Sequence, residues 1–394
     1  MGGLTAGRVL IAQGALEGTK VALAVAIRFS ADRPQFGSAP ILDYITHARR
    51  LAPALASTYG YHLAILKLKA LYAKKEAGPG DAKAVHVLSS VLKAGATWAR
   101  VEAQQAAREC AGGMGFLAAN RIGLFSTSFF VFSSFSGAGG RKRARGRRRH
   151  HHPPFLFSRT PPSLSLLSLS FSPQLSENDQ DVDVTFEGDN TVLMSTVARA
   201  VVEERKGGGG LTTPPPPPPL PPGGVAADPV WLLALARWRE EALAAELAGA
   251  LAAAGANPKA AAAAWDARLD AAVELGWARA DGETIGALVD ASIAGPPDAR
   301  PALRALAAAH GCARAERAAA VLVAAGALGA DGRAGLAALR AAANGVYTSL
   351  TAGGKASPAL KLVAGWGIPD HLILAPIAFD WRKIGEGEGP ARLK

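Results

Sequence analysis

Apolar residues recur at intervals of three and four along most of this chain, which is the spacing of a packed α-helix. In the first half this pattern predicts four helices, at 7–29, 41–75, 82–110 and 191–204. Pro53 falls inside the second helix, where we expect a bend because proline removes a helical hydrogen bond. Strand-like alternation is scarce, so we expect an all-α protein whose first part is a four-helix bundle.

Turn and cap residues support these boundaries. Gly78-Pro79-Gly80 is expected to end the second helix, and Asp81 is expected to cap the third. Asp189 or Asn190 can cap the fourth, because a short side-chain oxygen accepts from the free N–H groups of a first helical turn.

The tract at 207–224 separates two helical regions. It holds four glycines, then eight prolines, then two more glycines, a composition typical of flexible and extended spacers. We therefore predict a first domain at 1–206, a linker at 207–224 and a second helical domain at 225–394.

In the second domain, Asp228-Pro229 and Asn257-Pro258 each place a cap before a helix-initiating proline. Its tryptophans are expected to pack in the core: Trp231, Trp238, Trp265 and Trp277. With only Cys110 and Cys312 available, the chain has no disulfide framework. Cys110 stands among apolar residues and glycines, so we interpret it as a packing residue and not as a nucleophile.

Residues 126–176 differ in composition from the rest of the chain. They contain no Asp or Glu, eight Lys or Arg and runs of Ser, Phe, Leu and Pro, without a lasting helical period. Their eight basic residues account for the difference between the formal net charge of +11 and a charge of +3 for the remainder. We interpret the tract as an insertion into the first domain, with a retained intron and a faulty gene model as the two alternative origins.

Three function classes are disfavoured by the same tract. The basic run at 141–149 can release counterions from phosphates, but no aromatic platform accompanies it, so no specific nucleic-acid interface is expected. The histidine triplet at 150–152 lacks a positioned fourth ligand, so we expect no metal site. The apolar runs at 125–135 and 155–171 are too short or too interrupted for the roughly 20 residues of a membrane span.

The clearest candidate for chemistry is Glu187, in the stretch Thr185-Phe186-Glu187-Gly188-Asp189-Asn190-Thr191. Gly188 allows a sharp bend, so the carboxylate can point into a cleft and not along a helix face. The alternative interpretation is a solvated acidic residue in a loop, which is common for a single glutamate.

Two further motifs stand upstream. Arg33-Pro34-Gln35-Phe36-Gly37 follows the first predicted helix, and Glu109-Cys110-Ala111-Gly112-Gly113-Met114-Gly115-Phe116 follows the third. In this order, the three motifs resemble the C-terminal helical domain of the acyl-CoA oxidase and acyl-CoA dehydrogenase flavoprotein superfamily. The resemblance runs from Gly7 to about Arg199, apart from the tract at 126–176.

The peroxisomal oxidase branch is favoured by two features. The sequence Phe-Glu-Gly-Asp-Asn at 186–190 looks more like oxidases than like dehydrogenases. The C-terminal residues 367–381 are similar to the end of the extra helical domain that oxidases carry.

The resemblance implies that the protein oxidises a fatty acyl-CoA to the trans-2-enoyl-CoA. Glu187 matches the family's base, which removes the α-proton while the β-hydrogen leaves as hydride to FAD. Phe186 and Gly188, beside it, are expected to contact the substrate, with Phe186 helping to exclude water. In an oxidase O2 then reoxidises the flavin and gives H2O2, whereas the alternative, a dehydrogenase, uses an electron-transfer flavoprotein.

The resemblance also implies a set of FAD contacts: Arg33, Gln35, Phe36, Glu109, Gly112 and Gly113. An arginine suits the flavin pyrophosphate, and the glycines let the backbone approach the adenosine half. Pro34 departs from the usual basic or polar residue. Because the family shares FAD across a subunit interface, a homodimer is implied. Arg8 has two interpretations, a residue near the active site and a surface helix residue.

Family members place an N-terminal helical domain and a β-domain before the segment that matches Gly7. We therefore expect the chain as written to hold the base and part of the FAD contacts, and a non-catalytic helical fragment that dimerises remains the alternative to an active enzyme. A peroxisomal location is implied by the family. The final Ala391-Arg392-Leu393-Lys394 is only a near miss to a Ser-Lys-Leu type signal.

Overall fold

The computed structural model describes residues 2–74, 79–120, 122, 182–207, 213–225 and 227–382. The first part contains the elements α1 (Gly2–Asp32), η1 (Ile41–Asp43), α2 (Ile45–Ala73), α3 (Pro79–Cys110), η3 (Gly112–Phe116), η4 (Ala118–Asn120) and α6 (Asn190–Gly207). The second contains α7 (Pro229–Ala253), α8 (Pro258–Asp266), α9 (Leu269–Ala294), η6 (Pro297–Ala299), α10 (Arg300–Arg317), α11 (Ala319–Ala324), α12 (Gly332–Thr351), η7 (Gly354–Ala356), α13 (Pro358–Ala364), α14 (Asp370–Ile373) and η8 (Pro376–Ala378).

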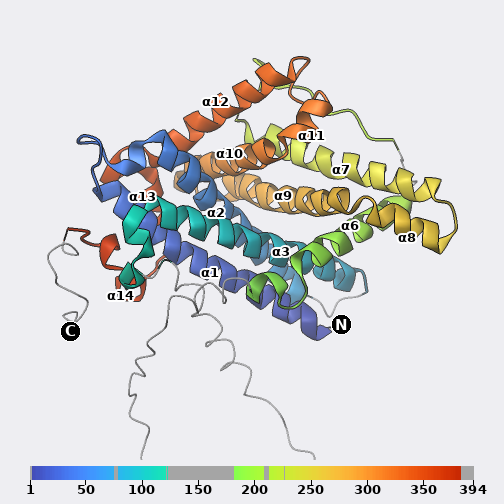
Figure 1. Cartoon of the computed structure of the whole chain (residues 1–394), viewed down its shortest axis with the longest axis horizontal. Helices are drawn as coiled ribbons and strands as arrows, with labels where there is room; N and C mark the ends of the chain where they lie inside the picture. Colours follow the sequence, from blue (N-terminus) through green and yellow to red (C-terminus); the bar gives the residue numbers. More distant parts are fainter. Residues whose placement is uncertain are drawn as a thin grey trace, which may run out of the picture.

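The prediction of an all-α fold is confirmed. In the described part of the chain, the one β-type pairing is an isolated bridge between Pro34 and Pro40. α1 packs along α3 and α2, and α6 packs against both α3 and α9 (Figure 1). α6 therefore belongs to the first bundle and also joins it to the helices that follow residue 228.

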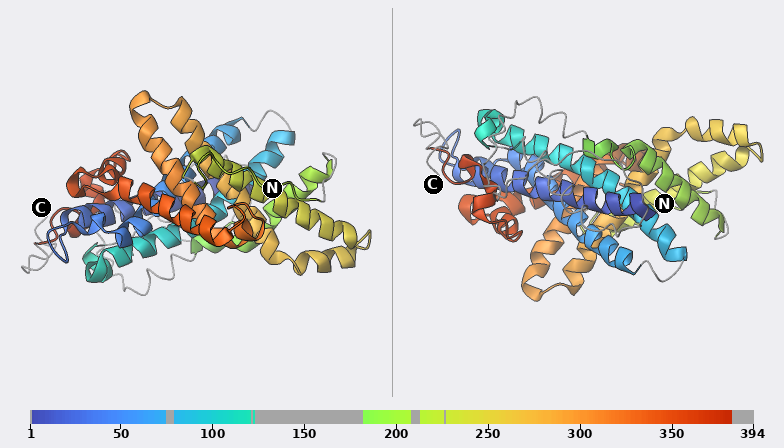
Figure 2. Two further views of the ribbon diagram at one scale, coloured as in Figure 1. Left: turned by 90° about the horizontal axis from the view of Figure 1, so that it is seen from above. Right: turned by 90° about the horizontal axis from the view of Figure 1, so that it is seen from below.

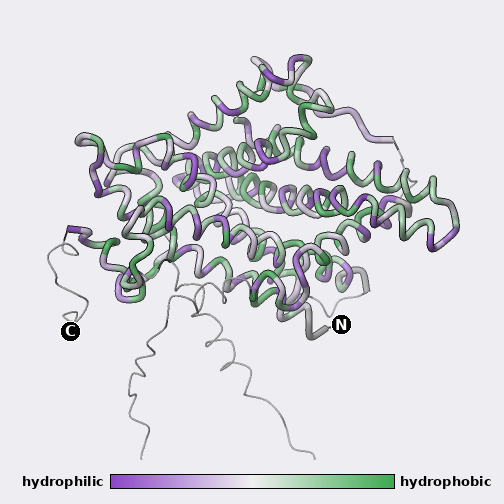
Figure 3. Tube along the Cα trace, viewed as in Figure 1, coloured by the Kyte–Doolittle hydropathy of each residue, from purple (hydrophilic) through white to green (hydrophobic). Residues whose placement is uncertain are grey.

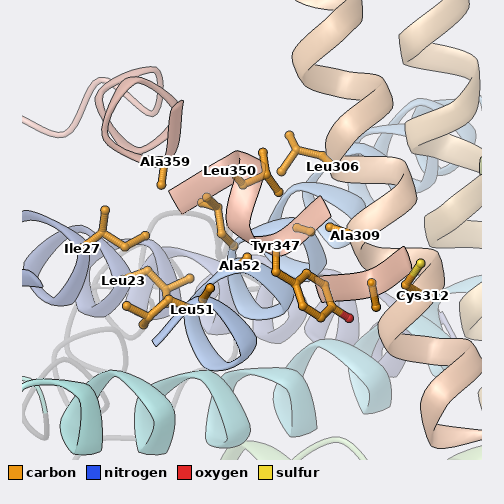
Figure 4. Close-up of a cluster of buried hydrophobic side chains, with 14 of the residues drawn as sticks. Leu23, Ile27, Leu51, Ala52, Leu306, Ala309, Cys312, Tyr347, Leu350 and Ala359 are labelled. Atoms are coloured by element: carbon orange, nitrogen blue, oxygen red, sulfur yellow. The ribbon is translucent and has the colours of Figure 1, made fainter. Parts of the chain in front are cut away.

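The largest hydrophobic core draws on both halves of the sequence. Figure 4 shows Leu23 and Ile27 of α1 and Leu51 of α2 in one cluster with Leu306 of α10 and Tyr347 of α12. Hydrophobic and hydrophilic residues are interspersed along most helices (Figure 3). The buried apolar faces form this core and a second one, which includes Val197 of α6 and Trp265 of α8. Burial of these apolar faces is the main force that joins the two halves.

The structure tests the predicted caps. Asp189 accepts from the N–H of Val192 at 3.1 Å, Asp228 accepts from that of Trp231, and Asn257 accepts from those of Lys259 and Ala260, so these predictions are confirmed. The prediction for Asp81 is wrong. α3 begins at Pro79, because proline has a helical φ and needs no hydrogen-bond acceptor at a first position.

Pro53 lies inside α2 and does not end it, and the bend expected there stays a prediction. α2 ends at Ala73, before the Gly78-Pro79-Gly80 turn that was expected to end it, and Pro79 and Gly80 lie in α3 instead. The four tryptophans Trp231, Trp238, Trp265 and Trp277 are buried. Cys110 and Cys312 are buried free thiols, and burial raises the pKa of Cys110 to about 11, which suits packing and not nucleophilic attack.

α1 is long and apolar enough, by length and composition, to cross a membrane over Thr5–Asp32. Two-thirds of that apolar window is buried against other helices, as in the core helix of a bundle. Several predictions fall outside the described residues: the insertion at 126–176 with its basic run and histidines, the apolar runs at 125–135 and 155–171, part of the linker, and the C-terminal near-miss signal.

Two glycines of α12 give a matched test of packing. A Cβ added at Gly335 would overlap the backbone carbonyl of Leu328, whereas one at Gly345 would meet nothing within 4 Å. We expect Gly335→Ala to lower the free energy of unfolding by about 1–3 kcal/mol. Gly345→Ala should raise it by about 0.5–1 kcal/mol, because alanine favours helix. Urea denaturation measures both, and equal effects of the two changes would contradict this packing.

His310 predicts a pH dependence of stability. It is 1% exposed, with Nε2 2.8 Å from Thr284 Oγ1, and burial lowers its pKa to about 4 from 6.5. The unfolded chain therefore binds this proton at a higher pH than the folded protein does. We expect this contribution to be fully present above pH 6.5 and lost as pH falls through about 4, a change of about 3 kcal/mol.

Urea denaturation at pH 7 and at a pH near 4 measures this contribution. His310→Gln carries no titrating group and should flatten the dependence. If the free energy of unfolding of His310→Gln depended on pH as strongly as that of the unaltered protein, carboxylates and not His310 would cause the dependence.

Candidate active site

Glu187 lies in a tight turn between two helical segments. Residues 182–185 form one helical turn, and the N–H of Phe186 donates to the carbonyl of Val182 at 2.8 Å. Glu187 then adopts φ 56°, in the left-handed region, and Gly188 follows with φ 117°. A residue with a Cβ pays about 1–2 kcal/mol for that conformation, so contacts around the turn must hold it.

Lys93 of α3 provides three of those contacts. Its Nζ donates to the carbonyl of Val184 at 3.1 Å, to the carbonyl of Gly188 at 2.8 Å and to Oδ1 of Asn190 at 3.0 Å. Asn190 in turn donates to Thr97 Oγ1 at 2.9 Å. The turn is therefore fixed to the middle of α3 on both sides of Glu187.

Arg8 of α1 provides the contact to Glu187 itself. Its Nε donates to the backbone carbonyl of Glu187 at 3.0 Å, and its other end donates to Ser90 Oγ on α3 at 3.0 Å. Arg8 is only 7% exposed, so its interpretation as a surface helix residue is wrong. The guanidinium links α1, α3 and the Glu187 turn.

The Glu187 carboxylate packs against the first turns of α1. A Cβ added at Gly7 would overlap it, so the carboxylate uses the space that this glycine leaves open. Its Oε2 is buried and accepts no hydrogen bond from the described residues. Phe186, beside it, is 46% exposed and presents an apolar surface. A carboxylate oxygen without a donor is available to take a proton from a bound molecule.

A second candidate region is an open pocket of ≈ 430 Å³ at the opposite end of α1. Its lining includes all six residues that the motifs predicted as FAD contacts: Arg33, Gln35, Phe36, Glu109, Gly112 and Gly113. The turn after α1 and the turn after α3, far apart in the sequence, thus face one cavity.

The backbone around this pocket is shaped for close approach. Gly112 has φ 57°, and a Cβ at Gly112 or Gly113 would meet nothing within 4 Å. Phe36 also has a positive φ, 55°, and is 90% exposed at the rim. The hydroxyl of Tyr44 donates to the carbonyl of Gln35 at 2.8 Å and fixes that turn.

Arg33 lies between two aromatic rings. Its guanidinium carbon is 5.5 Å from the ring centroid of Phe29 and 4.5 Å from that of Trp381. Trp381 comes from the C-terminal segment, so this segment helps to orient Arg33 at the pocket. Asp32, next to it, pairs with Lys355 and Arg382 and adds to the same attachment.

The Glu187 turn and the pocket are far apart within one chain. Glu187 lies against Gly7 near the start of α1, and the pocket begins at Phe29 and Arg33 at the other end of that helix. α1 runs as one long helix away from the N-terminus (Figure 2, right). A helix rises about 1.5 Å per residue, so 25 residues of α1 separate them by about 38 Å. The structure does not bring the predicted base and the predicted FAD contacts together into one site.

Comparison with known proteins shows what the first part of the chain is similar to. A family model described as "Acyl-CoA oxidase, C-alpha1 domain" matches residues 1–138. Residues 1–138 are therefore similar to this acyl-CoA oxidase domain. The resemblance drawn from the motifs is therefore confirmed for this segment.

Curated acyl-CoA oxidases are similar over the same length. A putative peroxisomal acyl-coenzyme A oxidase 3.2 of Arabidopsis thaliana is 42% identical over 140 residues, covering 34% of this chain and 20% of that protein. Human peroxisomal acyl-coenzyme A oxidase 3 is 36% identical over 139 residues, covering 32% and 20%. The matched segment thus spans about a fifth of the length of these relatives.

Solved acyl-CoA oxidase structures share the fold of the whole chain. An acyl-CoA oxidase from Lycopersicon esculentum (tomato) superposes with a TM-score of 0.74 at 18% identity, covering 100% of this chain and 56% of that one. Acyl-CoA oxidase-1 of Caenorhabditis elegans, complexed with FAD and ATP, gives 0.73 at 16% identity, covering 97% and 53%. The chain therefore has the fold of the helical part of acyl-CoA oxidases and spans about half of their length.

Sequence reasoning missed Lys93 as a neighbour of Glu187. A signal was present in this acyl-CoA oxidase-like helix, because Lys93, Thr97 and Arg100 recur at helical spacing within an otherwise apolar stretch. All three are almost fully buried, and each contacts the segment at 183–190, Thr97 through Asn190 and Arg100 through an ion pair with Asp183. The Glu187 turn therefore packs on the polar face of α3.

Proposed function

We propose that this chain provides the base and flavin-contacting helices of an FAD-dependent acyl-CoA oxidase, which converts a fatty acyl-CoA and O2 to the trans-2-enoyl-CoA and H2O2. The observation that carries the proposal is the Glu187 turn in a chain that begins with an acyl-CoA oxidase domain. Glu187 has a left-handed backbone conformation and is held on both sides, and one of its carboxylate oxygens is buried without a donor among the described residues, so it is arranged to accept a proton.

Glu187 is the proposed base for the substrate's α-proton. Gly7 leaves the space its carboxylate occupies, and Arg8 fixes its backbone carbonyl. Phe186 and Gly188 are the proposed substrate contacts, and the ring of Phe186 limits water near the carboxylate. FAD, when bound, accepts the β-hydrogen as hydride and is reoxidised by O2.

The second pocket fits the FAD contacts that the motifs predicted. Arg33 places a guanidinium, oriented by two aromatic rings, where a pyrophosphate could pair with it. Gly112 and Gly113 expose backbone that a Cβ would cover. Glu109 lies on the same wall, where it accepts from Gln105 and pairs with Arg50.

The separation along α1 supports a homodimer. Because about 38 Å divides Glu187 from Arg33, one chain would offer the base to one flavin and the pocket to the flavin of its partner. Curated relatives carry peroxisomal names, so we also propose a peroxisomal location.

Purification of the chain tests the proposal. We expect the protein to retain FAD, to have twice the 40.4 kDa mass of one chain in light scattering, and to release H2O2 when given a fatty acyl-CoA in air. Enoyl-CoA formation that depends on an electron-transfer flavoprotein in place of O2 would support a dehydrogenase. A dimer without flavin or turnover would support the non-catalytic fragment.

Gly7 offers a substitution that acts on Glu187 from another helix. Gly7→Ala would displace the carboxylate, the movable end of a side chain, and not backbone. We expect H2O2 formation to fall by about 100-fold, because misplacement by about 1 Å is enough for such a loss. The melting temperature should stay close to that of the unaltered protein. Gly345→Ala, which fills open space, is the matched control, and equal activity of both variants would contradict the placement of Glu187.

A further inference from the structure

We propose that Lys93 is the positioning residue for Glu187: its buried ammonium holds the backbone on both sides of the left-handed turn. This inference rests on the proposed function for its catalytic meaning, while the structural hold can be measured independently of it. Lys93 does not contact the carboxylate and is not a catalytic residue.

The burial of Lys93 is the first argument. The side chain is 0% exposed, whereas lysine is among the residues that are rarely buried without a partner. Among the described residues, no carboxylate lies within ion-pair distance of its Nζ, and its three hydrogen bonds go to two carbonyls and an amide. A buried ammonium is costly unless it is hydrogen-bonded, so Lys93 needs these three oxygen acceptors. The same three hydrogen bonds fix the positions of the acceptor oxygens.

The identity of the acceptors is the second argument. The carbonyls of Val184 and Gly188 flank Glu187, and Asn190 opens α6 directly after the turn. An ammonium is a compact charge with three donors, so it can bind three oxygens that converge from a bent backbone. The three hydrogen bonds therefore hold both sides of the turn to one atom, Lys93 Nζ. They keep the backbone of Glu187 in its strained left-handed conformation.

The third argument is electrostatic. The charged groups that face Lys93 are Asp183, Asp189 and Glu187 on the turn segment and Arg8 on α1. Burial lowers the pKa of Lys93 to about 8, so the ammonium is mainly charged at neutral pH. Burial raises the pKa of the Asp183 carboxyl, and the charges of Arg100 and Lys93 oppose that rise.

Hydrogen–deuterium exchange with mass spectrometry tests the hold. In Lys93→Met we expect the amides of Phe186 and Gly188 to exchange about tenfold faster, while α9 and α10 keep their protection. Lys83→Met is the matched control, because Lys83 is exposed on the same helix and, among the residues that the structure describes, pairs with Glu204 at the surface. Unchanged exchange at the turn in Lys93→Met overturns the proposal.

A second variant decides the question if Lys93→Met does not fold. Lys93→Arg keeps the charge, but a planar guanidinium cannot reach three oxygens arranged around a point. We expect it to raise exchange at Phe186 and Gly188 by about threefold. Exchange at the turn equal to that of the unaltered protein overturns the proposal.

Turnover separates the positioning role from a purely structural one. We expect Lys93→Met to lower kcat by about 100-fold with KM within about threefold and with flavin content unchanged. A fall in flavin content and melting temperature together, with kcat per bound flavin unchanged, would assign Lys93 to general stability and overturn the proposal. If the unaltered protein forms no H2O2, the proposed function fails, and the exchange result still decides whether Lys93 holds the turn.

Discussion

Glu187→Gln is expected to abolish H2O2 formation while leaving the protein folded and its flavin bound. The amide has the size of the carboxylate but cannot take up a proton, so the α-proton has no acceptor. General base catalysis contributes up to about 10⁴-fold, and we expect a loss of that order in kcat. A peroxidase-coupled assay at saturating acyl-CoA measures it, with flavin absorbance and thermal melting recorded on the same samples.

The geometry makes this test specific. Glu187 is fixed through its neighbours' carbonyls and its own, and not through its carboxylate, so the substitution removes no hydrogen bond of the turn. Glu203→Gln is the matched control, because Glu203 is an exposed residue of the adjoining helix α6. Activity of Glu187→Gln within tenfold of the control would mean that another group removes the proton.

Asp281→Asn is expected to have the largest effect on stability. Asp281 of α9 is 1% exposed and accepts from Arg239 of α7 at 2.7 Å and from Arg314 of α10 at 2.5 Å. Without the carboxylate charge, the Arg239 and Arg314 guanidinium groups lose the acidic group that both of them donate to. Breaking a buried ionic contact in this way costs about 3–5 kcal/mol, a large part of the total stability of a typical protein.

Urea denaturation of Asp281→Asn measures this loss. Asp290→Asn is the matched control on the same helix, because Asp290 pairs with Lys67 at 2.6 Å with both side chains largely exposed. Such a surface pair contributes about 0–1 kcal/mol. A loss below about 1 kcal/mol for Asp281→Asn as well would show that the Arg239 and Arg314 charges are compensated by other groups.

The sequence by itself determined the local structure of this protein well. Helical periodicity predicted the four helices of the first bundle. Asp228 and Asn257 marked helix starts, because a short side-chain acceptor followed by proline is a combination that favours the first turn of a helix. Asp81 was misjudged because the first turn can begin at Pro79 without a cap. The motif order also predicted the similarity of the first segment to acyl-CoA oxidases, which the match of residues 1–138 to an acyl-CoA oxidase domain supports.

Tertiary structure alone decided how distant residues meet. It placed Lys93 and Arg8 around Glu187, since a turn of 182–190 returns to α3 and α1 across a long stretch of sequence. It also set Glu187 and Arg33 at opposite ends of α1, and it joined helices from both sides of the predicted linker in one hydrophobic core. Local propensities fix where a helix starts and which face is apolar, but they carry no information on which faces meet, because that choice depends on burial and charge pairing over the whole chain.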